Sequence, residues 1–150
     1  MAPLRELYQQ VILDHNRSPR NFREMEDATR SVEAYNPLCG DHYTVYVKMD
    51  GGKIAAMSFK GAGCAISKAS ASVMTSVVRG KSRDEVLEMF EDFRRLVTGE
   101  MEGEAQLETH GKLAAFGGVK EFPARVKCAI LPWHALRSAL TSEDPAVSTE

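Results

Sequence analysis

The sequence predicts an α+β fold in which a small three-stranded antiparallel sheet packs against helices. Residues 42–50 and 53–60 alternate apolar and polar side chains with the period of a half-buried strand. Asp50-Gly51-Gly52 between them has the composition of a tight hairpin turn, so the two strands are antiparallel neighbours. From residue 66 onward apolar residues recur at helical spacing instead. Strands followed by a run of helices are typical of an α+β fold with the helices on one face of the sheet.

The elements before the hairpin are predicted from apolar periodicity and from helix-breaking residues. Residues 3–15 form an amphipathic helix, because their apolar residues recur at helical spacing and Pro3 suits a first turn. Ser18-Pro19-Arg20-Asn21 breaks this helix. Residues 28–35 are the candidate for the third strand.

Helices account for most of the second half. One runs from Ile66 to the closing Arg79-Gly80, and Ser82-Arg83-Asp84-Glu85 is a capping box that begins the next. Thr98-Gly99 ends that second helix. Residues 99–105 are acidic and contain glycine, so we expect a mobile loop there.

The end of the chain is predicted to hold two further helices and a tail. Residues 107–116 form a short helix with Gly117-Gly118 as its stop, and a last helix carries Trp133 and its apolar neighbours. Pro132 cannot donate a hydrogen bond to the carbonyl of residue 128, so this helix either starts or bends there. We expect a single domain over residues 1–140 and a flexible tail over residues 141–150.

Composition narrows the function classes. The 150 residues, 43% of them hydrophobic, suffice for one core without disulfides. A net charge of −2 without a basic stripe argues against a nucleic-acid partner. The first residues lack the apolar stretch of a signal peptide and no long apolar run follows, so we expect a cytoplasmic protein that does not enter a membrane. Three cysteines, an odd number, favour metal or thiol chemistry over disulfides in a reducing compartment.

Cys39, Asp41, Cys64 and Cys128 supply one set of four ligands for a zinc-sized ion. In an extended segment Cys39 and Asp41 face the same way, and Gly40 lets the backbone bend around a cation. Cys64 would lie near a helix N-terminus whose partial positive charge favours the thiolate.

Cys128 follows Arg125 and Lys127, two cations that act on its thiol in the same direction. A buried cysteine with no ligand role is the common alternative. Three cysteines at predicted turns or helix starts favour a shared site instead, although their separations of 25 and 64 residues form no local signature.

The histidines are poorer ligand candidates. His42 follows Asp41 and would point the opposite way in an extended strand. His15, near the end of the first helix, is expected to interact with the helix dipole, with a partner surface as the alternative.

Four stretches of the chain resemble the family of iron–sulfur cluster assembly proteins that includes the IscU scaffolds and the SufU-type sulfurtransferases. They run in the family's order across about residues 7 to 140. The stretches are Leu7-Tyr8 with Asp14-His15 and Pro19-Arg20-Asn21, then Asn36-Pro37-Leu38-Cys39-Gly40-Asp41, then Gly61-Ala62-Gly63-Cys64-Ala65-Ile66-Ser67 with Ala69-Ser70-Ala71-Ser72, and finally Phe122-Pro123-Ala124-Arg125-Val126-Lys127-Cys128.

Three features resemble the SufU branch more than the scaffold branch. Scaffold members carry a histidine immediately before the third cysteine, where this chain has Lys127. They also carry a Pro-Pro-Val-Lys motif just upstream, where this chain has Phe122-Pro123-Ala124-Arg125. The interval between Cys64 and Cys128 is longer than the scaffold branch allows.

The resemblance implies a zinc-bound protein that takes persulfide sulfur from a pyridoxal-phosphate-dependent cysteine desulfurase and passes it towards cluster assembly. Cys39 is the expected acceptor, since it lies on a loop beside Gly40 while Asp41 holds the metal. Arg125 would stabilise the anionic sulfur or pair with Asp41, and an ordinary surface arginine is the alternative. A scaffold for a transient [2Fe-2S] cluster and a purely structural zinc module are the competing functions.

Overall fold

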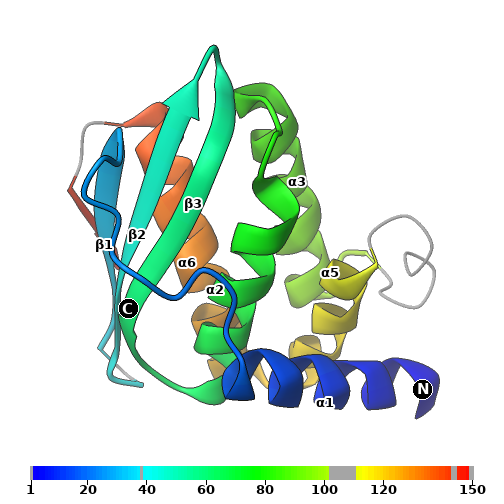
Figure 1. Ribbon diagram of the computed structural model, residues 1–150. Coiled ribbons are helices and arrows are strands. Elements are labelled where there is room, and N and C mark those ends of the chain that lie inside the picture. The colour runs from blue at the N-terminus through cyan, green and yellow to red at the C-terminus, as the bar shows by residue number, and fades with distance from the viewer. Residues whose placement is uncertain (1, 38, 102–110, 143–144, 149–150) are drawn as a thin grey trace.

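The computed structural model describes residues 2–37, 39–101, 111–142 and 145–148 (Figure 1). Within them the chain forms α1 (Ala2–Arg17), β1 (Arg30–Asn36), β2 (Asp41–Asp50), β3 (Lys53–Ala62), α2 (Ala65–Val78), α3 (Arg83–Thr98), α5 (Lys112–Ala115), the 3-10 helix η2 (Phe116–Glu121), α6 (Pro123–Thr141) and β4 (Ala146–Ser148).

The sheet has the strand order β3-β2-β1-β4, and helices pack on one of its faces (Figure 1). β1 pairs antiparallel with β2, and β2 pairs antiparallel with β3. Alternate residues of β1 and β2 are buried, as expected for a sheet covered on one side, and they include Val32 and Ala34 on β1 and Tyr43 and Val45 on β2. On β3, where the register shifts, Ile54 and Phe59 are fully buried. The α+β prediction is therefore confirmed.

α2 lies at the centre of the helical layer, in contact with α1, α6 and β3. Its buried positions are mostly alanine, serine and other small residues, which allow neighbouring helices to approach closely. Trp133 of α6 stacks on Phe93 of α3 with ring centroids 4.6 Å apart. α3 begins at the predicted capping box, where Ser82 and Glu85 exchange hydrogen bonds, and ends at Gly99 in the left-handed conformation.

The sheet has four strands where the sequence predicted three. Ala146–Ser148 pairs parallel with β1 over three residues and lies within the segment predicted as a tail. So short a strand leaves no periodic pattern to read, and it forms because the edge of β1 offers hydrogen-bonding partners. The flexibility of residues 141–150 and the domain boundary at residue 140 stay predictions.

Two helix boundaries also differ from the predictions. Gly117-Gly118 does not stop a helix, because both glycines lie within η2, which continues from α5. α6 begins at Pro123, at its first turn, so Pro132 lies inside this helix instead of at its start. Residues 102–110, which include most of the predicted acidic loop and the start of the predicted helix 107–116, fall outside the described residues.

One end of the sheet gathers the segments that matter for the site. β1 ends and β2 begins there, with Asn36 opposite Asp41. β3 ends there too, with Ala62 opposite His42, and leads directly into α2. Among the described residues, no helix is long and apolar enough to cross a membrane.

Candidate metal centre

Four predicted ligands from three distant segments meet at this end of the sheet. The Sγ atoms of Cys39 and Cys128 lie 3.2 Å apart. One ligand atom each from Cys39, Asp41 and Cys128 forms a group in which every pair is within 4.8 Å. Cys64 is not a member of this tight group but joins it through contacts to Asp41 and Cys128. The structure thus brings the four residues together as the sequence predicted, with three of them closer than the fourth.

Cys39 lies in a turn between β1 and β2. Its backbone N–H donates a 3.2 Å hydrogen bond to the carbonyl of Asn36, and the next residue, Gly40, has φ of 72°. The extended segment predicted to align Cys39 with Asp41 is absent, because the chain turns here. The bend predicted at Gly40 is present, in the left-handed conformation that glycine adopts without strain.

Asp41 is the first residue of β2 and is only 2% exposed. Its Oδ1 accepts a 2.8 Å hydrogen bond from the backbone N–H of Cys64 and lies 3.1 Å from the hydroxyl of Ser67. Its Oδ2 lies 3.4 Å from the side-chain amide of Asn36, which also lies 3.4 Å from Sγ of Cys128. A buried carboxylate needs such partners.

Sequence reasoning did not single out Asn36, Ser67 or Tyr43, whose hydroxyl lies 2.9 Å from that of Ser67. All three are buried and belong to different elements. Burial raises the pKa of Tyr43, so its hydroxyl stays protonated. Ser67 and Asn36 lie in the stretches that resemble the family. A polar residue on a face predicted to be buried is the sequence feature that could have indicated their role.

Cys64 is the N-cap residue of α2, as predicted for a cysteine at a helix start. Its sulfur accepts a 3.4 Å hydrogen bond from the backbone N–H of Ser67. A hydrogen bond from Cys128, together with those from Ser67, lowers the pKa of Cys64 to about 6. The lowered pKa favours the thiolate form of Cys64 in the metal-free protein.

Cys128 is fully buried in the interior of α6, five residues after the helix begins. Of the two alternatives predicted here, the helix does not start at this position, because Pro132 lies inside α6. Residue 132 still has no N–H to offer the Cys128 carbonyl. Its hydrogen bond to the Cys64 sulfur, together with burial, raises the pKa of Cys128. In the metal-free protein the thiol form of Cys128 is therefore favoured.

Arg125 lies one helical turn before Cys128 and reaches across to Cys39. Its Nη1 is 4.0 Å from Sγ of Cys39. Interaction with Cys128 and Cys64 raises the pKa of the Arg125 guanidinium. Of the two contacts predicted for Arg125, the described ion pairs contain none with Asp41, so its position favours interaction with sulfur.

Neither histidine near these segments joins the site. His42 is exposed, stacks on Tyr35 with ring centroids 4.4 Å apart and faces Glu33, as its place in the strand predicted. His15 is 1% exposed, and its Nδ1 lies 2.7 Å from the hydroxyl of Ser72, so it is not on a surface that a partner could reach. Burial lowers the pKa of His15 to about 4.

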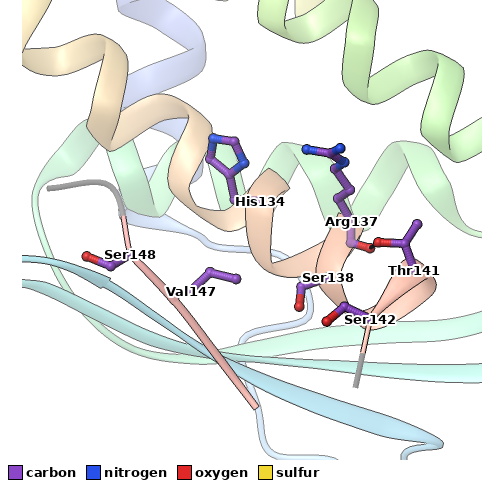
Figure 2. Close-up of a pocket in the computed structure, with 7 residues that line it drawn as sticks. All are labelled: His134, Arg137, Ser138, Thr141, Ser142, Val147 and Ser148. Atoms are coloured by element: carbon purple, nitrogen blue, oxygen red, sulfur yellow. Dashed lines mark hydrogen bonds between the residues drawn. The ribbon is translucent and has the colours of Figure 1, made fainter. Parts of the chain in front are cut away.

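A separate pocket of about 330 Å³ lies at the opposite end of α6 from Pro123, beside β4 (Figure 2). Figure 2 shows His134 and Arg137 on α6 and Val147 and Ser148 beside them among its lining residues. The described lining residues include no cysteine and no carboxylate. This pocket is therefore distinct from the thiol site.

The fold and the site together define a class of protein. It is an α+β protein with three thiols and a buried carboxylate at one end of the sheet. The thiols lie in a turn, at the start of a helix and inside another helix, and the carboxylate lies at the start of a strand. The chain belongs to the NifU-like N-terminal domain family, whose model matches residues 7–129. The family predicted from the sequence is thereby confirmed.

Two curated relatives are each 40% identical to this chain. One is the zinc-dependent sulfurtransferase SufU of Bacillus subtilis (strain 168), aligned over 95% of both chains. The other is the iron–sulfur cluster assembly scaffold protein IscU of Streptococcus pyogenes serotype M1, aligned over 93% of this chain and 86% of the relative. Among solved structures, FiSufU from Fervidobacterium islandicum AW-1 superimposes with a TM-score of 0.82 at 36% identity, over 91% of this chain and 98% of that one.

Proposed function

We propose that this protein is a zinc-dependent sulfur acceptor in iron–sulfur cluster assembly. In this function Cys39, Asp41, Cys64 and Cys128 hold Zn²⁺, and Cys39 receives sulfur from the persulfide of a pyridoxal-phosphate-dependent cysteine desulfurase. Downstream cluster-assembly proteins then take the sulfur from this chain. The cytoplasmic location expected from the sequence belongs to the same proposal.

The observation that carries the proposal is the compactness of the ligand group. Ligand atoms of a single tetrahedral zinc ion with Zn–S bonds of about 2.3 Å lie about 3.8 Å from one another. The mutual distances within 4.8 Å for Cys39, Asp41 and Cys128 fit one such ion. A two-iron cluster distributes its protein ligands over two metal ions and suits a wider group. Sulfur and carboxylate donors are ordinary zinc ligands, so the chemistry of the set also fits.

Zinc bound here would keep its sulfur ligands deprotonated and, having no redox chemistry, would leave their oxidation state unchanged. Cys39 is the ligand suited to leave, since its turn is half-exposed whereas Cys128 is buried in a helix. Its freed thiolate attacks the outer sulfur of the desulfurase persulfide. A new S–S bond forms on Cys39, the donor's S–S bond breaks, and the donor cysteine leaves as a thiolate. No external oxidant or reductant is required.

Arg125 has a role in this step that its position supports. The guanidinium lies near Cys39 and carries a positive charge at every accessible pH. It would stabilise the anionic sulfur of Cys39 both before attack and as the persulfide anion. A cation at about 4 Å from a half-exposed thiolate attracts it without blocking the approach of the donor.

The scaffold function is the second candidate, because one of the relatives at 40% identity is named as a scaffold. The same three thiolates and carboxylate can coordinate iron. Reconstitution with iron and sulfide separates the two functions. A scaffold gains visible absorbance that survives gel filtration, whereas the proposed zinc protein stays colourless and keeps its zinc.

The direct test of the proposal measures cysteine desulfurase turnover with and without this protein, alongside its metal content. We expect about one zinc per chain and faster turnover that depends on that zinc. A protein that binds the desulfurase and carries zinc but leaves turnover unchanged would instead be a structural zinc module.

A further inference from the structure

We propose that Ser67, supported by Tyr43, is a positioning residue for Asp41. It keeps Oδ1 of Asp41 in hydrogen bonds within the protein, so that Oδ2 is the oxygen free to coordinate a metal ion. The inference rests on the proposed zinc site and adds to it the residues that orient its one carboxylate.

The Oδ1 side of Asp41 is saturated by donors from the start of α2. The backbone N–H of Cys64 donates at 2.8 Å, and the Ser67 hydroxyl lies at 3.1 Å. The Ser67 proton has a second acceptor at 3.1 Å, the Cys64 carbonyl. The ionised carboxylate is the stronger acceptor, since hydrogen bonds to a charged group are roughly twice as strong as neutral ones.

Tyr43 orients the Ser67 hydroxyl. The two oxygens are 2.9 Å apart, and both residues are fully buried. When the Tyr43 hydroxyl donates to the Ser67 oxygen, the Ser67 hydroxyl can donate its own proton to Oδ1 of Asp41. Both side chains are locked by burial, so this arrangement exists before any metal arrives.

The Oδ2 side of Asp41 lies towards Cys128, through Asn36. The Asn36 amide lies 3.4 Å from Oδ2 and 3.4 Å from Sγ of Cys128, which places that oxygen on the sulfur side of the carboxylate. Both contacts are long, so Oδ2 retains capacity to coordinate. The carboxylate is thereby oriented for one-oxygen coordination, and it would hold its place while Cys39 leaves the metal.

Zinc affinity of the Ser67→Ala and Tyr43→Phe variants, measured by competition with a chromophoric chelator, tests this inference. We expect Ser67→Ala to weaken zinc binding by about 10- to 100-fold, the range for lost partners of metal ligands. Tyr43→Phe removes only the phenol oxygen and should weaken binding in the same direction. Ser76→Ala is the matched control, because Ser76 lies on the same helix and its hydroxyl donates to the helical carbonyl of Ser72, with no bond to the site among the described residues.

Two further readouts separate positioning from mere structural support. Zinc should raise the melting temperature of Ser67→Ala by less than it raises that of the unmodified protein. In an Asp41→Ala background, Ser67→Ala should change zinc affinity no further, because the oxygen that it orients is gone.

Unchanged zinc affinity in Ser67→Ala, with a lower melting temperature of the metal-free protein, would overturn the inference and leave the proposed function intact. So would an equal loss of affinity in the Asp41→Ala background. Absence of zinc binding by the unmodified protein would overturn both the inference and the proposed function.

Discussion

The backbone N–H of Cys64 donates a 2.8 Å hydrogen bond to Oδ1 of Asp41, which joins two predicted ligands without a metal. Asp41 is the first residue of β2 and Cys64 is the N-cap of α2. Together with the contact from Ser67, this bond holds the start of β2 against the start of the helix. A site assembled in this way is largely formed in the folded chain. Metal binding then adds the last cross-link between segments far apart in the sequence.

Removing one sulfur ligand should release the metal. We expect Cys64→Ser and Cys128→Ser each to lose most of the zinc, because a serine hydroxyl is a poor zinc ligand beside the remaining thiolates. Zinc should also raise the melting temperature of the unmodified protein, since it binds the folded state only. Metal analysis and thermal unfolding check both statements. Near-stoichiometric zinc in either variant would refute its residue as a ligand.

Gly63→Ala should disrupt the site by steric contact. A Cβ at this position would lie 2.4 Å from Asp41 Oδ1, 2.6 Å from the Tyr43 hydroxyl and 2.7 Å from Ser67 Oγ. These atoms are buried and bonded to one another, so we expect a loss of about 1–3 kcal/mol in the free energy of unfolding together with lower zinc occupancy.

Gly80→Ala is the control for Gly63→Ala. Gly80 has φ of 83° with nothing near its Cβ position, so its substitution strains the backbone without touching the site. It should cost stability yet keep zinc occupancy unchanged. Equal zinc loss in both variants would show that general destabilisation, and not contact with Asp41, explains the effect.

The thiols of Cys64 and Cys128 should differ in reactivity in the metal-free protein. Because the pKa of Cys64 is lowered to about 6, its thiolate forms as the pH rises through that value. Alkylation by iodoacetamide should therefore reach its half-maximal rate at Cys64 near pH 6, while Cys128, buried and with a raised pKa, reacts slowly even at pH 8. Peptide mapping by mass spectrometry measures both rates. Faster alkylation of Cys128 than of Cys64 would contradict the lowered pKa of Cys64.

Position 127 should influence which metal species the site retains. Lys127 replaces the histidine of scaffold members, so Lys127→His should increase retention of a reconstituted iron–sulfur cluster while zinc binding stays largely intact. Visible absorbance after reconstitution measures the gain, with Lys127→Gln as the control that removes the charge without adding a ligand. Equal absorbance in the two variants would mean that this residue does not distinguish the branches.

Local signals in the sequence predicted most of the fold. The capping box at Ser82, the stop at Gly99 and the Asp50-Gly51-Gly52 hairpin each act through hydrogen bonds between near neighbours, and each was confirmed. β4 was missed because its pairing depends on a distant strand. The start of α6 at Pro123 was not predicted, because the effect of Pro132 left a helix start and a bend equally open.

The candidate ligands could also be predicted, since cysteine and aspartate side chains are metal ligands by their own chemistry. Their supporting residues could not. Asn36, Ser67 and Tyr43 are ordinary polar residues whose role depends on which buried atoms the fold places beside them, and Tyr43 and Ser67 are 24 residues apart in the chain. The bend at Gly40 was predicted, whereas the extended conformation of Cys39 was not found.

The most direct test of the account locates the transferred sulfur. After incubation of the zinc-loaded protein with a cysteine desulfurase and cysteine, peptide mass spectrometry should find the added sulfur on the peptide that contains Cys39. Cys39→Ala should then neither accept sulfur nor accelerate the desulfurase, although Asp41, Cys64 and Cys128 keep some zinc. Added sulfur on the peptide containing Cys64 or Cys128, with continued acceleration by Cys39→Ala, would contradict the account.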